Sequence, residues 1–136
     1  DLAEKLGVSE RVRFLGWRND VPALLASADI FLCTSRHEPL GNMVIEAWAH
    51  QVPVVSVASQ GPTQLIRHGE NGLLSPIDNP SELAKNVLNL INNPDQAAEL
   101  AISGNESYKT NFTEGQIVRK YEEFFDKIMA ENIRNT

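Results

Sequence analysis

Short apolar segments alternate with helical patterns between residues 11 and 74, and this order constrains the fold more than any other feature of the sequence. The segments typical of strands are residues 11–16, 30–33, 53–57 and 73–74. The helical patterns between them cover residues 22–28, 41–51 and 63–67. Strands that alternate with crossover helices predict a parallel α/β sheet with right-handed connections.

The second apolar segment indicates where a site is expected. Residues 30–33 are apolar without alternation, which is typical of a central parallel strand covered on both faces. The loop of residues 34–40 follows the carboxyl end of this strand. Open α/β sheets bind ligands beyond the carboxyl ends of their strands, so we expect the site in this loop.

From Pro80 onward the pattern is helical only. Ser81 is the expected cap of one helix, the pair Asn93-Pro94 stops it, and a second helix begins near Asp95. The apolar residues of a last helix recur at three- and four-residue spacing: Ile117, Val118, Tyr121, Phe124, Phe125, Ile128 and Met129. We expect this face to pack against the core, with contact to another domain or to a second copy as the alternative.

Composition and charge narrow the functional classes. The 136 residues carry a formal net charge of -6 without a basic stripe, which argues against nucleic-acid binding. Cys33 is the single cysteine, so no internal disulfide is possible and a reducing compartment is expected. No segment has the roughly 20 apolar residues that span a bilayer, and we expect a cytoplasmic location. Residues 2–7 have the pattern of a helix end without an initiator Met, so we expect the chain to be part of a longer protein.

The loop and the helix after it have the elements of an anion site. Pro39 fixes the approach to the turn, and Gly41 allows close contact with a ligand. The N–H groups of Leu40, Gly41 and Asn42 are expected to be free at the helix N-terminus, where amides favour a phosphate. An anion at such a position gains about 0.3–1 kcal/mol when exposed and up to about 2 kcal/mol when partly buried.

Two carboxylates lie on either side of this anion cradle. Glu38 precedes it, and Glu46 interrupts the apolar stretch of the helix that follows. Carboxylates accept hydrogen bonds from paired hydroxyls, so the two residues suit the sugar and the ribose of a nucleotide sugar. The structural alternatives are that either Glu stabilises the helix dipole or that Glu46 pairs with His50, one turn on.

The run from Glu38 to Glu46 resembles the Glu-x7-Glu motif of retaining glycosyltransferases of the GT-B fold, especially the group 1 (family 4) set. Other segments resemble that family's landmarks in order: residues 14–17, 28–32, 52–55 and 69–74. The resemblance implies a Rossmann-like parallel sheet with flanking helices, which is the C-terminal, donor-binding half of such an enzyme without its first strand or strands. Residues 1–136 would then be one partial domain, with its core over residues 1–93 and C-terminal helices over residues 94–131.

The resemblance also implies the roles of individual residues. The site would consist of Glu38 for the donor sugar, Glu46 for the ribose, and the amides of Leu40, Gly41 and Asn42 for the diphosphate. Trp17 and Arg18 fall where the family's loop touches the nucleobase, and His37 would face the sugar; loop packing and solvation are the alternatives for these three. Gln64 stands where family members often carry Glu, so a charge-dependent role is not expected there, and it would bond a ligand or cap a short helix.

No Asp-x-Asp motif and no His/Cys cluster occurs in the sequence, so we expect neither a metal nor another cofactor. The resemblance implies a nucleotide-sugar donor and an N-terminal acceptor domain in the same longer protein, with any peripheral membrane association arising through that protein. The expected activity is retaining transfer of a glycosyl group, with this chain inactive alone. The alternatives are a non-catalytic nucleotide-sugar-binding or assembly module and, less favoured, a nucleotide-sugar epimerase.

Overall fold

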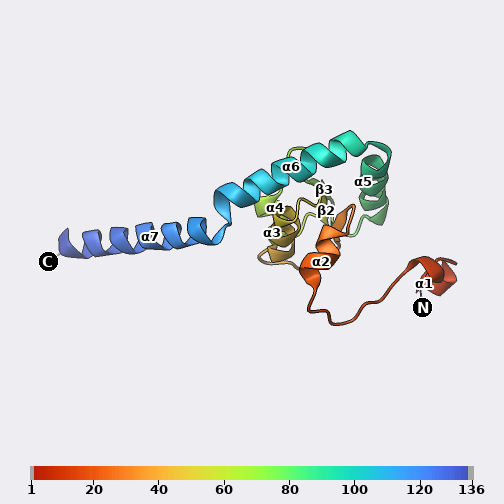
Figure 1. The fold of residues 1–136 in the computed structure, drawn as a ribbon, viewed down its shortest axis with the longest axis horizontal. Helices are drawn as coiled ribbons and strands as arrows, with labels where there is room; N and C mark the ends of the chain where they lie inside the picture. Colours follow the sequence, from red (N-terminus) through yellow and green to blue (C-terminus); the bar gives the residue numbers. More distant parts are fainter. Residues whose placement is uncertain (1, 135–136) are drawn as a thin grey trace.

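The computed structural model of the protein describes residues 2–134, with side chains through residue 131. The helices are α1 (Leu2–Lys5), the 3-10 turn η1 (Ser9–Arg11), α2 (Val21–Ala26), α3 (Asn42–Ala49), α4 (Gln60–Leu65), α5 (Pro80–Asn92), α6 (Pro94–Asn111) and α7 (Glu114–Arg134). The strands are β1 (Phe31–Cys33), β2 (Val54–Val57) and β3 (Leu73–Ser75). Strands and helices alternate from α2 to α5 (Figure 1), as the sequence predicts.

The three strands form one parallel sheet in the order β1-β2-β3, so β2 is the middle strand. Every residue of β2 is buried, because α3 packs on one face and α5 with α6 on the other. β1, which we predicted to be central and covered on both faces, is an edge strand, and Leu32 is 44% exposed. The prediction was wrong because β1 has a paired neighbour on one side only among the described residues.

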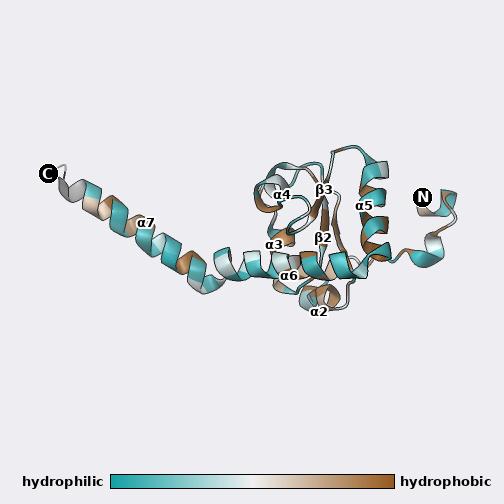
Figure 2. Ribbon diagram, turned by 90° about the horizontal axis from the view of Figure 1, so that it is seen from above, coloured by the Kyte–Doolittle hydropathy of each residue, from teal (hydrophilic) through white to brown (hydrophobic). Residues whose placement is uncertain are grey.

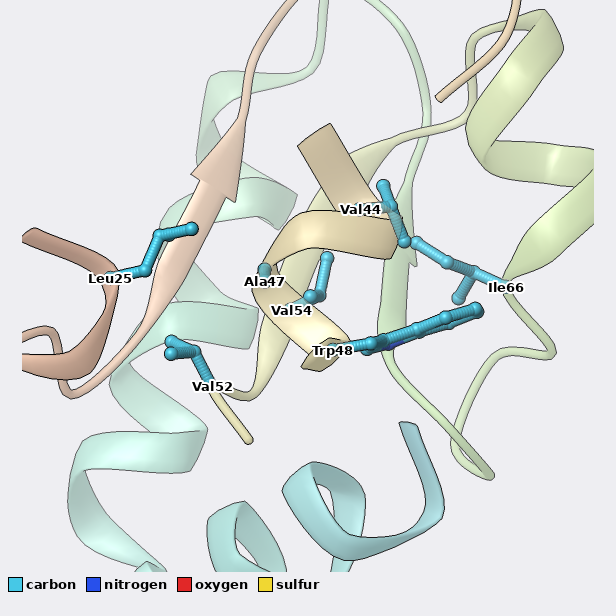
Figure 3. Close-up of a cluster of buried hydrophobic side chains, with 7 residues drawn as sticks. All are labelled: Leu25, Val44, Ala47, Trp48, Val52, Val54 and Ile66. Atoms are coloured by element: carbon cyan, nitrogen blue, oxygen red, sulfur yellow. The ribbon is translucent and has the colours of Figure 1, made fainter. Parts of the chain in front are cut away.

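Alternate residues of β2 face two hydrophobic clusters. Val54 belongs to the cluster around α3, whose members are drawn in Figure 3: Leu25, Val44, Ala47, Trp48, Val52, Val54 and Ile66. Val55 faces the opposite side and packs with Leu90 of α5 and Leu100 of α6. Successive side chains of a strand point to opposite faces, so this one strand joins both helical layers.

Trp48 connects α3 to the rest of the fold. The residue is 1% exposed, and its indole N–H donates to the backbone carbonyl of Asn71 at 3.0 Å. Asn105 of α6 donates its side-chain N–H to the Trp48 carbonyl at 2.9 Å. A Cβ at Gly104 would lie 2.6 Å from the indole nitrogen, so α6 approaches α3 this closely only with glycine there.

The segment before α2 departs from the sequence prediction. Residues 11–16 were expected to form a strand, but Arg11 ends η1 and residues 12–16 pair with no strand in the part of the chain that the structure describes. An alternating pattern makes a strand only where a neighbour accepts its backbone hydrogen bonds. Without that neighbour Phe14 is 83% exposed, and the segment runs outside the body of the fold (Figure 1).

Two helix starts also differ from the prediction. α4 begins at Gln60 rather than Thr63, because Pro62 is tolerated in a first turn. The cap of α5 is Asn79 rather than Ser81: its side chain accepts the N–H of Glu82 at 3.0 Å. Asn caps as well as Ser does, and a proline at the first helical position then fixes the start. The predicted boundary at Asn93-Pro94 is confirmed, since α5 ends at Asn92 and α6 begins at Pro94.

α7 extends away from the sheet and from the other helices (Figures 1 and 2). Its apolar side chains range from 36% exposed at Ile117 to 63% exposed at Met129. The predicted packing of this face against the core is therefore wrong for the described residues. The rings contact one another instead, with the centroids of Phe124 and Phe125 5.8 Å apart. None of the helices described here is both long and apolar enough to cross a membrane.

Candidate functional site

Two helix N-termini meet at the carboxyl end of the sheet. β1 leads through residues 34–41 into α3, and β2 leads through residues 58–59 into α4. Gly61 in the first turn of α4 donates its N–H to the backbone carbonyl of Glu38 at 2.6 Å. The loop that the sequence singled out is thus held between the two helix starts, at the end of the sheet where α/β proteins bind ligands.

Gly41 is the N-cap of α3 and is buried. Its φ of 74° lies in the left-handed region that favours glycine. A Cβ at this position would also lie 2.7 Å from Cδ1 of Leu65. The backbone conformation therefore requires glycine at this turn, and a larger residue would also force the Leu65 side chain to move.

The carboxylate of Glu38 lies at the start of α3. Its Oε1 accepts the N–H of Gly41 at 2.9 Å, and the side chain is half-buried. We predicted that the Gly41 N–H is free, and this was wrong for the structure as it stands. A helix N-terminus favours negative charge by roughly 0.3–1 kcal/mol, and the nearest carboxylate takes that place.

The neighbouring amides remain available. The N–H groups of Leu40 and Asn42 have no acceptor among residues 2–134, and both residues are exposed. Asn42 is the first residue of α3, and Leu40 lies just before the cap Gly41. Both N–H groups are therefore at the helix start, where an anion can be received. His37, beside Glu38, is exposed and has no hydrogen-bond partner within the same residues.

Glu46 does not form the side-chain pair with His50 that the sequence left open. Nδ1 of His50 contacts the backbone carbonyl of Glu46 at 2.9 Å, and the Glu46 carboxylate is exposed without a partner in the described part of the chain. Glu46 lies four residues after Asn42 and therefore shares its helix face. Because Cα–Cβ bonds of a helix tilt toward its N-terminus, the Glu46 side chain starts out in the direction of the free amides.

Trp17 and Arg18 lie on the segment that precedes α2, and their side-chain hydrogen bonds are made to residues of that same segment. Trp17 is 92% exposed, and its indole N–H donates to Oδ1 of Asn19 at 3.0 Å. Arg18 makes two hydrogen bonds with the carboxylate of Asp20, at 2.7 and 2.5 Å. These hydrogen bonds lower the pKa of Asp20 and raise the pKa of Arg18. The contact of this pair with a nucleobase stays a prediction.

Gln64 lies exposed in α4 and borders a hollow that Asn111 and Lys120 also line, on the side of α6 and α7. α4 spans Gln60–Leu65, so Gln64 is not its cap, and that alternative is wrong. The cap position belongs to Ser59. Its hydroxyl is buried and has no hydrogen-bond partner among the described residues.

The sequence did not predict the ion pair between Arg36 and Asp78, in which Nε and Oδ1 are 2.6 Å apart. The pair stands at the edge of a hollow of ≈ 480 Å³ that Thr34, Val57 and Leu83 also line. The predicted topology could have indicated this pair, because the loops after β1 and β3 both follow the carboxyl end of one parallel sheet. Within residues 2–131, no group of three or more His, Cys, Asp or Glu side chains could hold a metal ion.

A family model described as "Glycosyl transferases group 1" matches residues 1–93. The chain is 41% identical over 120 residues to the lipopolysaccharide core biosynthesis glycosyltransferase LpsE of Rhizobium meliloti. This alignment covers 88% of this chain and 35% of that protein. It is 32% identical over 129 residues to LpsD of the same organism, and this alignment covers 95% of this chain and 38% of that protein. The chain thus spans about a third of the length of these relatives.

Solved structures agree with the sequence relatives. The crystal structure of HepE from Anabaena in complex with UDP has a TM-score of 0.88 and 31% identity, over 92% of this chain and 35% of that chain. The complex of HepE with UDP-glucose has a TM-score of 0.86 at the same identity and coverage. These similarities confirm the predicted α/β fold class and the predicted family resemblance.

Proposed function

This chain belongs to the group 1 glycosyl transferases, and from this we propose that it is the C-terminal, donor-binding half of a retaining glycosyltransferase. The observation that carries the proposal is the start of α3, where two amides without acceptors lie between Glu38 and Glu46 in the sequence. UDP is the nucleotide to test first, because HepE, a structural relative, is solved with UDP and with UDP-glucose.

In this proposal the diphosphate of the donor lies at the N-terminus of α3. The N–H groups of Leu40 and Asn42 are without acceptors, and the N–H of Gly41 is occupied by Glu38. A phosphate oxygen that takes the Gly41 N–H displaces the Glu38 carboxylate. Two anions compete for one donor, and the diphosphate bonds the neighbouring amides at the same time. The displaced carboxylate is then free to accept hydrogen bonds from the hydroxyls of the donor sugar.

Glu46 binds the ribose in this proposal. Its carboxylate is exposed and unpaired among the described residues, so no existing contact has to break before it accepts the two vicinal hydroxyls. A carboxylate offers two oxygens and can accept from both hydroxyls together. In the donor, the diphosphate lies between the sugar and the ribose. The proposed binding residues follow the same order along the chain: Glu38, the amides, then Glu46. His37, Trp17 and Arg18 remain proposed as secondary contacts to the sugar and the base.

The reaction breaks the bond between the anomeric carbon and the diphosphate oxygen and forms a bond from the same carbon to an acceptor hydroxyl, with the configuration retained. Negative charge grows on the leaving diphosphate, and preorganised backbone amides stabilise it electrostatically. We propose that a metal is not required, so added EDTA should leave the rate unchanged. The acceptor domain is proposed to belong to the remainder of a longer cytoplasmic protein, and the isolated chain is proposed to be inactive.

The first experiment measures binding of UDP by titration calorimetry, with Glu46→Gln as the test variant. Removing one partner of charge-assisted hydrogen bonds costs about 1.5–3 kcal/mol, so we expect UDP to bind roughly 10- to 150-fold more weakly. The control is Glu123→Gln, which removes one exposed carboxylate from α7 and should bind UDP as the unaltered protein does.

The competing functions give different results. In the full-length protein, Glu38→Gln should abolish transfer if the protein is an enzyme, whereas an assembly module would keep its phenotype. A nucleotide-sugar epimerase would convert the donor sugar to its epimer without an acceptor, and it would release free nucleoside diphosphate only if water also cleaves the anomeric bond. If UDP does not bind, or if the Glu46 and Glu123 variants bind it equally well, the proposed donor site is wrong.

A further inference from the structure

Gly61 lies where the first turn of α4 touches the first turn of α3. The residue is buried, and its N–H donates to the Glu38 carbonyl at 2.6 Å. The Glu38 side chain is held separately, through Oε1 and the Gly41 N–H at 2.9 Å. Two independent hydrogen bonds therefore fix the main chain and the carboxylate of the residue that the proposed function assigns to the donor sugar.

The lack of a side chain at Gly61 sets the distance between the two helix starts. A Cβ there would lie 2.6 Å from the Leu40 carbonyl carbon and 2.8 Å from the Glu38 carbonyl oxygen. It would also overlap the amide nitrogen of Gly41. All three neighbours are backbone atoms, so relief requires the loop itself to move rather than a side chain to rotate.

The glycine at this position is not explained by its own backbone. Gly61 is helical and lies outside the positive-φ region, in contrast to Gly41, so an alanine could adopt its conformation. Glycine is thus required for steric reasons only. The backbone that leaves no room for a side chain is the one that carries the amides of Leu40 and Gly41.

We propose that Gly61 is a positioning residue of the donor site. It binds the loop through the Glu38 carbonyl and, having no Cβ, lets the α3 amides lie where a diphosphate meets them. When the diphosphate displaces the Glu38 carboxylate from Gly41, the bond from Gly61 still holds the loop in place. This inference rests on the proposed function, because it assigns Gly61 to the geometry of that same site.

The test compares three glycine-to-alanine variants of the full-length protein. Gly61→Ala places a methyl group against the site, Gly104→Ala places one against the buried Trp48, and Gly115→Ala meets nothing within 4 Å. Each variant is characterised by its melting temperature, its affinity for UDP below that temperature, and its KM for the donor and kcat. A shift of about 1 Å at a binding site changes rates by up to about 100-fold.

We expect Gly61→Ala to weaken UDP binding at least tenfold and to raise the donor KM, measured where the variant is fully folded. Gly104→Ala should lower the melting temperature and leave UDP affinity within twofold, because its clash lies in the core. Gly115→Ala should change neither. If Gly61→Ala binds UDP as tightly as the unaltered protein, the inference is overturned. If the unaltered protein does not bind UDP, the proposed function fails first, and this inference fails with it.

A measurement without substitution covers the case in which Gly61→Ala does not fold. Amide hydrogen exchange should show the Gly61 N–H at least 100-fold slower than an exposed loop amide, and equally slow after UDP is added. The Gly41 N–H should change on addition of UDP, because its acceptor changes from a carboxylate to a phosphate. A Gly61 N–H that exchanges as fast as a loop amide, or becomes fast when UDP binds, would contradict the role of Gly61.

Discussion

Replacing Trp48 by Phe should destabilise the fold by about 2–5 kcal/mol. The indole N–H is the donor to the Asn71 carbonyl, and Asn71 is 1% exposed, so water cannot replace the lost bond. A buried acceptor left without a partner costs about 1–3 kcal/mol. The smaller ring leaves unfilled space against Gly104 and Phe112, which adds about 1–2 kcal/mol at ~0.8 kcal/mol per buried carbon.

The assay is thermal and urea unfolding followed by circular dichroism. At roughly 3–5 °C per kcal/mol for a domain of this size, the melting temperature should fall by roughly 6–25 °C. The control is the same substitution at the other of the chain's two tryptophans, Trp17→Phe, because Trp17 is 92% exposed. That variant should stay within about 0.5 kcal/mol of the unaltered protein. Equal unfolding midpoints for the two variants would refute the argument that Trp48 connects α3 to the rest of the fold.

Two further predictions concern exposed residues. In Arg18→Gln the pKa of Asp20 should rise toward its ordinary value, as measured by NMR titration, because the hydrogen bond from Arg18 is the main cause that lowers it. A lowered native pKa means that any stability from this pair is lost as the pH falls through that pKa, and an unchanged titration would contradict the pair. Phe124→Gln should change the free energy of unfolding in urea by less than about 0.5 kcal/mol, because the ring is 56% exposed. A loss of stability above about 2 kcal/mol would mean that the apolar face of α7 is covered.

The parts of the fold that the sequence predicts correctly depend on local signals. The runs that form β2 and β3 are mainly apolar whatever their neighbours are, and the pair Asn93-Pro94 ends a helix by its own covalent structure. The glycine at the start of α3 is likewise a local signal, because the left-handed backbone conformation of Gly41 favours glycine whatever lies around it.

The errors occurred where an element depends on a partner outside the segment. Residues 12–16 alternate correctly for a strand but have no strand beside them, and the face of α7 has nothing against it among the described residues. At the site, the positions of Glu38 and Glu46 followed from the pattern. The occupation of the Gly41 N–H did not, because it depends on which way one side chain turns, and the Arg36–Asp78 pair did not, because two distant loops bring it together.

The exposed edge of β1 bears on aggregation. Among the described residues β1 is paired on one side only, so its other side offers N–H and carbonyl groups to another strand, and Leu32 adds an apolar side chain there. The strand is three residues long, and Asp29 precedes it while Arg36 follows it closely. Short edges flanked by charge pair poorly with one another, so we expect the brevity of β1 to limit strand-to-strand association between copies of this chain at high concentration.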